Sequence, residues 1–420
     1  MTQEQPTVVV RMADAGDVYM SWRWIGETAP RGAAMLPGEP VLAAVQRLSD
    51  ALPHPAEPGG LERAMTTGAF AEPHAEYLVA QALSRALLPQ ALAAQLYELY
   101  QRGIRPHIRL QPSPRVAQVP WEILAPGPEV RLIDIADVSL LAPASIVHAP
   151  DRVARTWTES HDGPVVAVLD PRIPGFRADS HLGSVLGRMP ADAPLARRIA
   201  GYATQHRLLP AVLDPTEAFR RTDIDRTWLS KALRDGASRL IYVGHVTAAP
   251  PESGQSEAAE LHLACTADAL GFAVPHRTHR PLSAKDFLLG THTLAPEPAD
   301  GQDLWPIPSR VALIACESGG DLRFTEALGL TAAMINGGAE LVTASRWPLP
   351  TDLAFHRIAG APATAHPLQQ AICAIDAAHE QPDPVAALAA WQRERLHAWR
   401  TERTIEHSPL LWSAFATVRT

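Results

Sequence analysis

A thiol and an imidazole each follow an apolar run that has the length of a buried strand. The run RLIYVGH (239–245) ends in His245, and the run RVALIAC (310–316) ends in Cys316. If the two runs are neighbouring strands of a parallel sheet, both side chains lie at one rim. There the imidazole would favour the thiolate or take its proton during attack, and would then return a proton to a leaving amine. The pair therefore predicts nucleophilic catalysis on an acyl group.

Glycines beside these two residues are the first candidates for positioning the reaction. Gly319 and Gly320 come after one strand and before a helical pattern, which would leave backbone N–H groups at a helix N-terminus. Such groups stabilise an oxyanion. Gly244 lets the chain turn tightly beside His245.

The two runs belong to a series of buried strands separated by helical stretches. The other runs are VVAVLD (165–170) and AELVTAS (339–345), and continuous apolar runs of this kind are typical of parallel sheets buried on both faces. Helical spacing occurs at 191–203, 216–235, 282–290 and 321–336. This alternation predicts an α/β fold with a doubly wound, mostly parallel sheet flanked by helices.

The N-terminal part has a different pattern. Residues 7–26 alternate as in a hairpin, 75–102 is helical with a break at Pro89, and 138–147 has a strand pattern. A polar stretch follows, so we expect an N-terminal α/β lobe at 1–150, a linker at 151–163 and a second lobe at 164–420. At the C-terminus we expect two helices, at about 365–379 and 384–402, then a strand at 409–418, and we interpret 291–307 as an exposed loop.

Composition excludes several classes of function. The formal net charge of −8 over 420 residues argues against direct nucleic-acid binding, which needs a basic face. The three cysteines have neither metal-site nor disulfide spacing, which indicates reduced thiols and no metal or cofactor. With neither a signal-peptide pattern nor an apolar run long enough to span a membrane, we expect a cytoplasmic protein without a membrane partner.

Several ordered motifs resemble the CHAT domain, a caspase-like peptidase family named for its association with HetF and TPR repeats. Their order and spacing match from YVGH (242–245) through VALIACESGG (311–320) to the segment 326–352 that contains AELVTASRWPLPTD. Other matching stretches are VPWEIL (119–124), VLDPR (168–172), LHLACTADALG (261–271), LSAKDFLL (282–289) and LLWSAFATV (410–418). The resemblance covers nearly the whole chain and implies the clan of caspases, separase, gingipain and legumain.

The resemblance implies roles for particular residues. The family's catalytic histidine falls on His245 and its cysteine on Cys316, with the first lobe non-catalytic and the backbone at Gly244, Val246 and Cys316 holding the oxyanion. The family usually has glycine where this chain has Val246. Valine keeps the N–H group but does not easily adopt a positive φ, which favours a catalytically weak or inactive domain as an alternative.

The resemblance also implies a pocket for the substrate residue before the cut. It is built from the ends of the first and fourth core strands and from residues beside the cysteine, here Asp170, Glu317, Ser345, Trp347 and Asp352. Three converging acids would favour arginine or lysine in the substrate. In the alternative interpretation, Asp170 makes a turn, Glu317 enters a hydrogen-bond network, Asp352 caps a helix and Trp347 packs in the core.

From these residues we expect a cysteine endopeptidase that cleaves a protein substrate, by family analogy a regulated bacterial effector in immunity or cell-death signalling. Its regulation would come from an activating partner protein or from self-association. Two alternatives stay open: a CHAT module that only binds partners as a scaffold, and a Cys–His acyltransferase such as a transpeptidase or ligase, which would share the acyl-enzyme.

Overall fold

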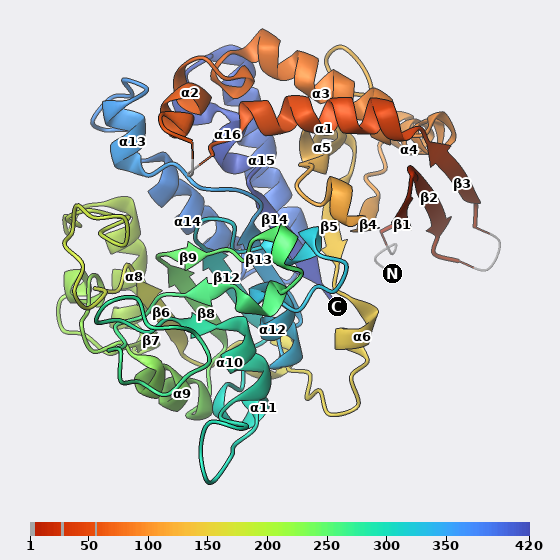
Figure 1. The fold of residues 1–420 in the computed structure, drawn as a ribbon. Helices are drawn as coiled ribbons and strands as arrows, with labels where there is room; N and C mark the ends of the chain where they lie inside the picture. The colour runs from red at the N-terminus through yellow and green to blue at the C-terminus, as the bar shows by residue number, and fades with distance from the viewer. Residues whose placement is uncertain (1–4, 27–28, 55–56) are drawn as a thin grey trace. The chain divides into compact units, whose positions relative to one another are not determined.

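The computed structural model describes residues 5–26, 29–54 and 57–420, which group into two compact units (Figure 1). The first unit contains the residues up to Leu141 together with Pro348–Pro367 and Gln381–Thr417, and the second contains Ala142–Trp347, Leu368–Glu380 and Val418–Thr420. The chain therefore passes back and forth between the two units in its C-terminal part. Each predicted lobe, in contrast, is one continuous range of residues. Boundaries at 150 and 164 stay a prediction.

The second unit is built on a parallel sheet with the strand order β13-β12-β8-β6-β7. Its strands are β6 (Val165–Leu169), β7 (Leu208–Leu209), β8 (Arg239–Val243), β12 (Arg310–Ile314) and β13 (Leu341–Ser345). Every residue of β6, β8, β12 and β13 is buried, as expected for strands covered on both faces. The α/β fold with a mostly parallel sheet flanked by helices is thereby confirmed, and β8 and β12 are neighbours.

Helices and a small antiparallel sheet complete the second unit. The helices are α6 (Ala144–Val147), α7 (Trp157–Ser160), α8 (Pro194–Thr204), α9 (Arg226–Arg234), α10 (Ala284–Leu289), α11 (Gly301–Leu304), α12 (Leu330–Asn336) and nearly all of α14 (Pro367–Ala378). The small sheet has the order β11-β10-β9, with strands β9 (Val246–Thr247), β10 (Glu260–Leu261) and β11 (Leu282–Ser283). The strand β9 begins directly after His245, so this sheet fixes the chain beyond the imidazole.

The first unit has a mixed sheet with the order β3-β2-β1-β4-β5-β14. Its strands are β1 (Thr7–Ala15), β2 (Asp17–Trp24), β3 (Arg31–Leu36), β4 (His107–Gln111), β5 (Asp137–Leu141) and the first three residues of β14 (Phe415–Arg419). Its helices are α1 (Gly38–Ala51), α2 (Gly60–Thr66), α3 (Pro73–Leu87), α4 (Gln90–Gln101), α5 (Leu132–Ile135), α13 (Asp352–Arg357), α15 (Pro384–Thr401) and α16 (Pro409–Trp412). Pro89 separates α3 from α4, as predicted.

Prolines explain two wrong strand predictions. The strand expected at 138–147 ends at Leu141, because Pro143 precedes the short helix α6. The strand expected at 409–418 begins only at Phe415, because Pro409 starts α16 under a cap from the Ser408 hydroxyl. The loop expected at 291–307 is also wrong at its end, where Trp305 and Ile307 are buried.

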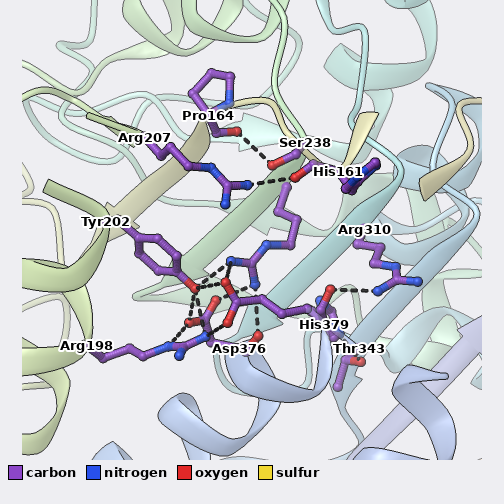
Figure 2. Close-up of polar contacts among 12 residues, drawn as sticks. His161, Pro164, Arg198, Tyr202, Arg207, Ser238, Arg310, Thr343, Asp376 and His379 are labelled. Carbon is purple, nitrogen blue, oxygen red and sulfur yellow. Dashed lines mark hydrogen bonds and ion pairs between the residues drawn. The ribbon is translucent and has the colours of Figure 1, made fainter. Parts of the chain in front are cut away.

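A buried ionic network lies where the core strands begin, away from the strand ends that carry His245 and Cys316. Arg239, the first residue of β8, donates to the Asp376 carboxylate over 2.6 Å and to the Tyr202 hydroxyl over 2.5 Å. Arg198 pairs with the same carboxylate, and the Arg310 guanidinium donates to the carbonyl of His379 over 2.7 Å (Figure 2). Arg239 is fully buried and Asp376 nearly so. The network holds α14 against the sheet.

Replacing Asp376 with asparagine should lower the free energy of unfolding by about 3–5 kcal/mol, because the buried Arg239 charge loses its main partner. Asp235→Asn is the matched control, since its ion pair with Lys231 is exposed and worth at most about 1 kcal/mol. Urea titrations of both variants measure the difference. If both variants lost the same small amount of unfolding free energy, the buried network would contribute little to stability.

His379 should make the second unit sensitive to acid. Burial lowers its pKa to about 3, and the neutral ring is hydrogen-bonded to the Thr343 hydroxyl over 2.8 Å. An unfolded histidine titrates near pH 6.5, so the unfolded chain takes up a proton first and stability falls as the pH drops from about 6.5 towards 3. We expect His379→Gln to flatten the decline of the urea midpoint between pH 7 and pH 5, whereas the exposed His292→Gln should not.

Candidate functional site

The ends of β8 and β12 bring His245 and Cys316 to the same level of the rim. Val243 is the register partner of Ile314, and the Gly244 N–H donates to the Ile314 carbonyl over 3.4 Å. His245 and Cys316 each lie two residues beyond that register pair. Because hydrogen-bonded strands run about 4.8 Å apart, the two residues leave the sheet side by side, as expected for neighbouring strands.

The His245 ring is oriented by a backbone carbonyl. Its Nε2 atom lies 2.9 Å from the Gly183 carbonyl oxygen. A carbonyl only accepts hydrogen bonds, so Nε2 carries the hydrogen, and in the neutral ring Nδ1 keeps a lone pair. Burial lowers the pKa of His245 below its usual value. At neutral pH the residue is therefore an uncharged imidazole with an acceptor nitrogen, the form that a general base needs.

Asp170 holds the loop that carries Gly183. Its buried carboxylate accepts hydrogen bonds from the Ser184 hydroxyl (2.5 Å) and from the N–H groups of Val185 (3.1 Å) and Leu186 (3.3 Å). Arg220 Nη1 completes the arrangement, at 3.3 Å from both the Asp170 carboxylate and the Gly183 carbonyl. This geometry leaves the Asp170 carboxylate facing the protein, in place of the predicted contact with substrate.

A second set of hydrogen bonds holds the turn at Cys316. The Ser318 hydroxyl donates to the Leu313 carbonyl over 2.6 Å, and the Ser345 hydroxyl donates to the Ala315 carbonyl. Ser345 is fully buried, so it ties the end of β13 to this turn and does not reach a substrate, contrary to the pocket prediction. Cys316 itself is half-buried.

The predicted oxyanion donors differ in what their N–H groups do. Gly319 donates to the Ser345 carbonyl over 2.9 Å and Gly320 to the Glu317 carbonyl over 3.0 Å, so the prediction that these two would hold an oxyanion is wrong. The Gly244 N–H continues the sheet towards Ile314. Val246 lies in β9 with a negative φ, so its β-branched side chain causes no backbone strain there. The Val246 and Cys316 N–H groups stay predicted donors.

Trp347 and the other two acids of the predicted pocket are also engaged. Trp347 is fully buried, in agreement with core packing and not with an open pocket wall. Glu317 accepts from Arg323 Nη1 over 2.8 Å, which offsets its charge. Asp352 belongs to the first unit, where it starts α13 after the Thr351 cap and lies 3.8 Å from His366 Nδ1. Substrate contacts of Glu317 and of Asp352 stay predictions.

Tyr242 is a positioning residue that the sequence did not reveal. Its hydroxyl lies 2.6 Å from the His245 carbonyl and 2.9 Å from the His262 carbonyl. A Cβ atom on Gly244 would lie 2.8 Å from this hydroxyl oxygen, which explains the glycine better than a tight turn does. The only possible signal was an aromatic residue in an apolar strand, which is ordinary.

The other two thiols are poor nucleophiles. Burial raises the pKa of Cys265, and it raises the pKa of Cys373 to about 11. Both therefore stay protonated at neutral pH. Within the described residues, no cluster of His, Cys, Asp and Glu side chains is arranged to hold a metal ion. The same residues include no helix with the length and apolarity to cross a membrane.

Comparison with known proteins identifies the family. Residues 78–420 match the model of the CHAT domain, so the chain belongs to the CHAT family, as its motifs indicated. Among solved structures, the chain is similar to one in the crystal structure of the Saccharomyces cerevisiae separase–securin complex, with 9% sequence identity and a TM-score of 0.49. That similarity covers 99% of this chain and 30% of the other chain. No curated protein sequence matches the chain.

Proposed function

We propose that the protein is a cysteine endopeptidase in which Cys316 is the nucleophile and His245 the general base and acid. The observation that carries the proposal is the register of β8 and β12, whose ends present both residues at one rim. Support also comes from the Gly183 carbonyl, which holds the His245 ring in the tautomer with a free acceptor nitrogen.

The reaction would proceed in two steps. His245 Nδ1 accepts the thiol proton as the Cys316 sulfur attacks the scissile carbonyl carbon, and the resulting imidazolium protonates the amine as the C–N bond breaks. Water, deprotonated by the same imidazole, then attacks the thioester and releases the acid product and the thiol. A neutral His245 is the starting state of this cycle, and burial favours that state by lowering the pKa of the ring.

Cleavage of a peptide library tests the proposal. Purified wild-type protein and Cys316→Ala are incubated with peptides derived from a whole proteome, and new termini are identified by mass spectrometry. Termini that arise only with wild type are expected, whereas identical products from both proteins would contradict peptidase activity. Arginine or lysine before the cut would support the predicted acidic substrate pocket, and other residues there would overturn that pocket alone.

The biological role that we propose is that of a bacterial effector of immunity or cell death, which is compatible with the CHAT family and with peptidase chemistry. The effector would cleave a protein substrate. It would be activated by a partner protein or by self-association. The acyltransferase alternative differs only in the acceptor of the thioester, so adding amine nucleophiles to the same assay separates it by ligated products. The scaffold alternative loses its main argument, because Val246 lies unstrained in β9.

A further inference from the structure

The outer end of the first unit's sheet has one covered face and one open face. On the covered face, the Nε1 atoms of Trp22 and Trp24 both donate to the Gln95 side chain of α4, over 3.1 and 2.8 Å. Because side chains alternate along strands, their neighbours point the other way. We call these residues the open sheet face: Arg11, Tyr19, Arg23, Ile25, Arg31 and Met35. Exposed fractions of 48% for Tyr19, 62% for Ile25 and 55% for Met35 make it unusually apolar.

Three arginines concentrate positive charge on this face. Arg23 is the direct register partner of Arg31 across β2 and β3, and Arg11 lies diagonal to Arg23, since Val9 is the partner of Arg23 on β1. Like charges in directly opposite positions destabilise a sheet. Among the described residues none of the three forms an ion pair, and the groove of about 720 Å³ that they line has no acidic lining residue. In a chain of net charge −8, this arrangement calls for an anionic partner.

The strand β3 adds a second, independent feature. It is the terminal strand of its sheet, so within the part of the chain that the structure describes its outer backbone groups have no strand partner. An extended peptide satisfies such groups by adding a strand, and alternate side chains of that strand then lie beside Arg31, Ala33 and Met35. A lipid surface or a nucleic acid has no backbone amides to supply these bonds.

We propose that the open sheet face and the edge of β3 dock an extended segment of a partner protein in which acidic and apolar residues alternate. The surface lies outside residues 78–420, which match the CHAT domain, so it goes beyond the proposed peptidase activity and does not depend on it. Carboxylates of the segment would lie on the open face, towards Arg31 and Arg23, and its apolar side chains would point to the other face, beside Ala34 and Leu36 of β3.

A fluorescein-labelled peptide of alternating glutamate and valine is the probe, with binding measured by anisotropy on the full chain. Wild type should bind it, Arg31→Gln should weaken binding about fivefold, and Arg23→Glu/Arg31→Glu should weaken it more than about 20-fold. Arg47→Glu, on the exposed side of α1, reverses a single charge elsewhere, a larger change than that of Arg31→Gln, and should have no effect. Because Arg31→Gln relieves the like-charge pair, its Tm should stay the same or rise by about 1–2 °C, which separates lost binding from lost folding.

Peptide chemistry tests the edge pairing. Two peptides are compared, one N-methylated at its odd-numbered residues and one at its even-numbered residues. One of them should lose binding and the other should keep it, because only alternate N–H groups of an added strand face β3. Equal binding of a lysine–valine peptide, or of a peptide of the same composition with its glutamates placed together, would overturn the proposal. So would self-association of wild type that Arg31→Gln abolishes, since the occupant would then be a second copy.

Discussion

Replacing His245 with alanine should slow peptide cleavage by about 10²–10⁴-fold, and replacing Cys316 with alanine should abolish it. The first loss is that of a positioned general base and acid, and the second removes the atom that forms the thioester. The rate of appearance of one cleaved peptide, followed by mass spectrometry at pH 7.5, measures both.

Cys373→Ala is the control for this pair of variants. It also removes a half-buried thiol from the second unit, yet burial raises the pKa of Cys373 to about 11 and no part of the mechanism uses it. Its rate should match that of wild type. Retention of wild-type cleavage in Cys316→Ala, with loss in Cys373→Ala, would place the nucleophile elsewhere.

Disrupting the Asp170–Arg220 pair should lower kcat by about 10²-fold with little change in KM. The pair holds the loop of Gly183, whose carbonyl orients His245, and a displacement of about 1 Å at a catalytic base costs this much. Asp170→Asn and Arg220→Met are the variants. Asp179→Asn, in the same loop but paired with Arg177 at the surface, is the matched control and should behave as wild type.

The two variants should also move the pH dependence in opposite directions. Besides burial, the charged groups that act on His245 are Asp170, which raises its pKa, and Arg220 and His181, which lower it. The base works only when deprotonated, so the acidic limb of kcat/KM follows this pKa. Asp170→Asn should shift the limb to lower pH and Arg220→Met to higher pH. A loss caused only by unfolding would leave the limb in place, which would contradict a positioning role.

The sequence predicted the core of the second unit well because its strands are continuous apolar runs that end in distinctive residues. The pairing of β8 with β12, whose ends lead into His245 and Cys316, followed from parallel strands sharing one rim. The sequence could not predict how the His245 ring is oriented, because a backbone carbonyl orients it. The Gly183 carbonyl lies in an irregular loop, and a carbonyl leaves no mark in the choice of side chain.

The predicted substrate pocket is a second feature that the sequence could not settle. Asp170, at a strand end, satisfies the pattern of a pocket residue, but its role is decided by the loop of Ser184 to Leu186, which folds onto its carboxylate. Ser345 likewise turns inward to the Ala315 carbonyl. Strand ends place side chains at a rim, whereas the loops between strands decide which of them face a substrate.

Covalent trapping tests the Cys316–His245 assignment most directly. A peptidyl acyloxymethyl ketone is made from the sequence of a cleaved peptide, and the modified residue is located by mass spectrometry in wild type and His245→Ala. Alkylation is expected at Cys316 in wild type, at a rate that falls at least about 100-fold in His245→Ala. Modification of Cys265 or Cys373 in its place, or of Cys316 at equal rates in both proteins, would contradict it.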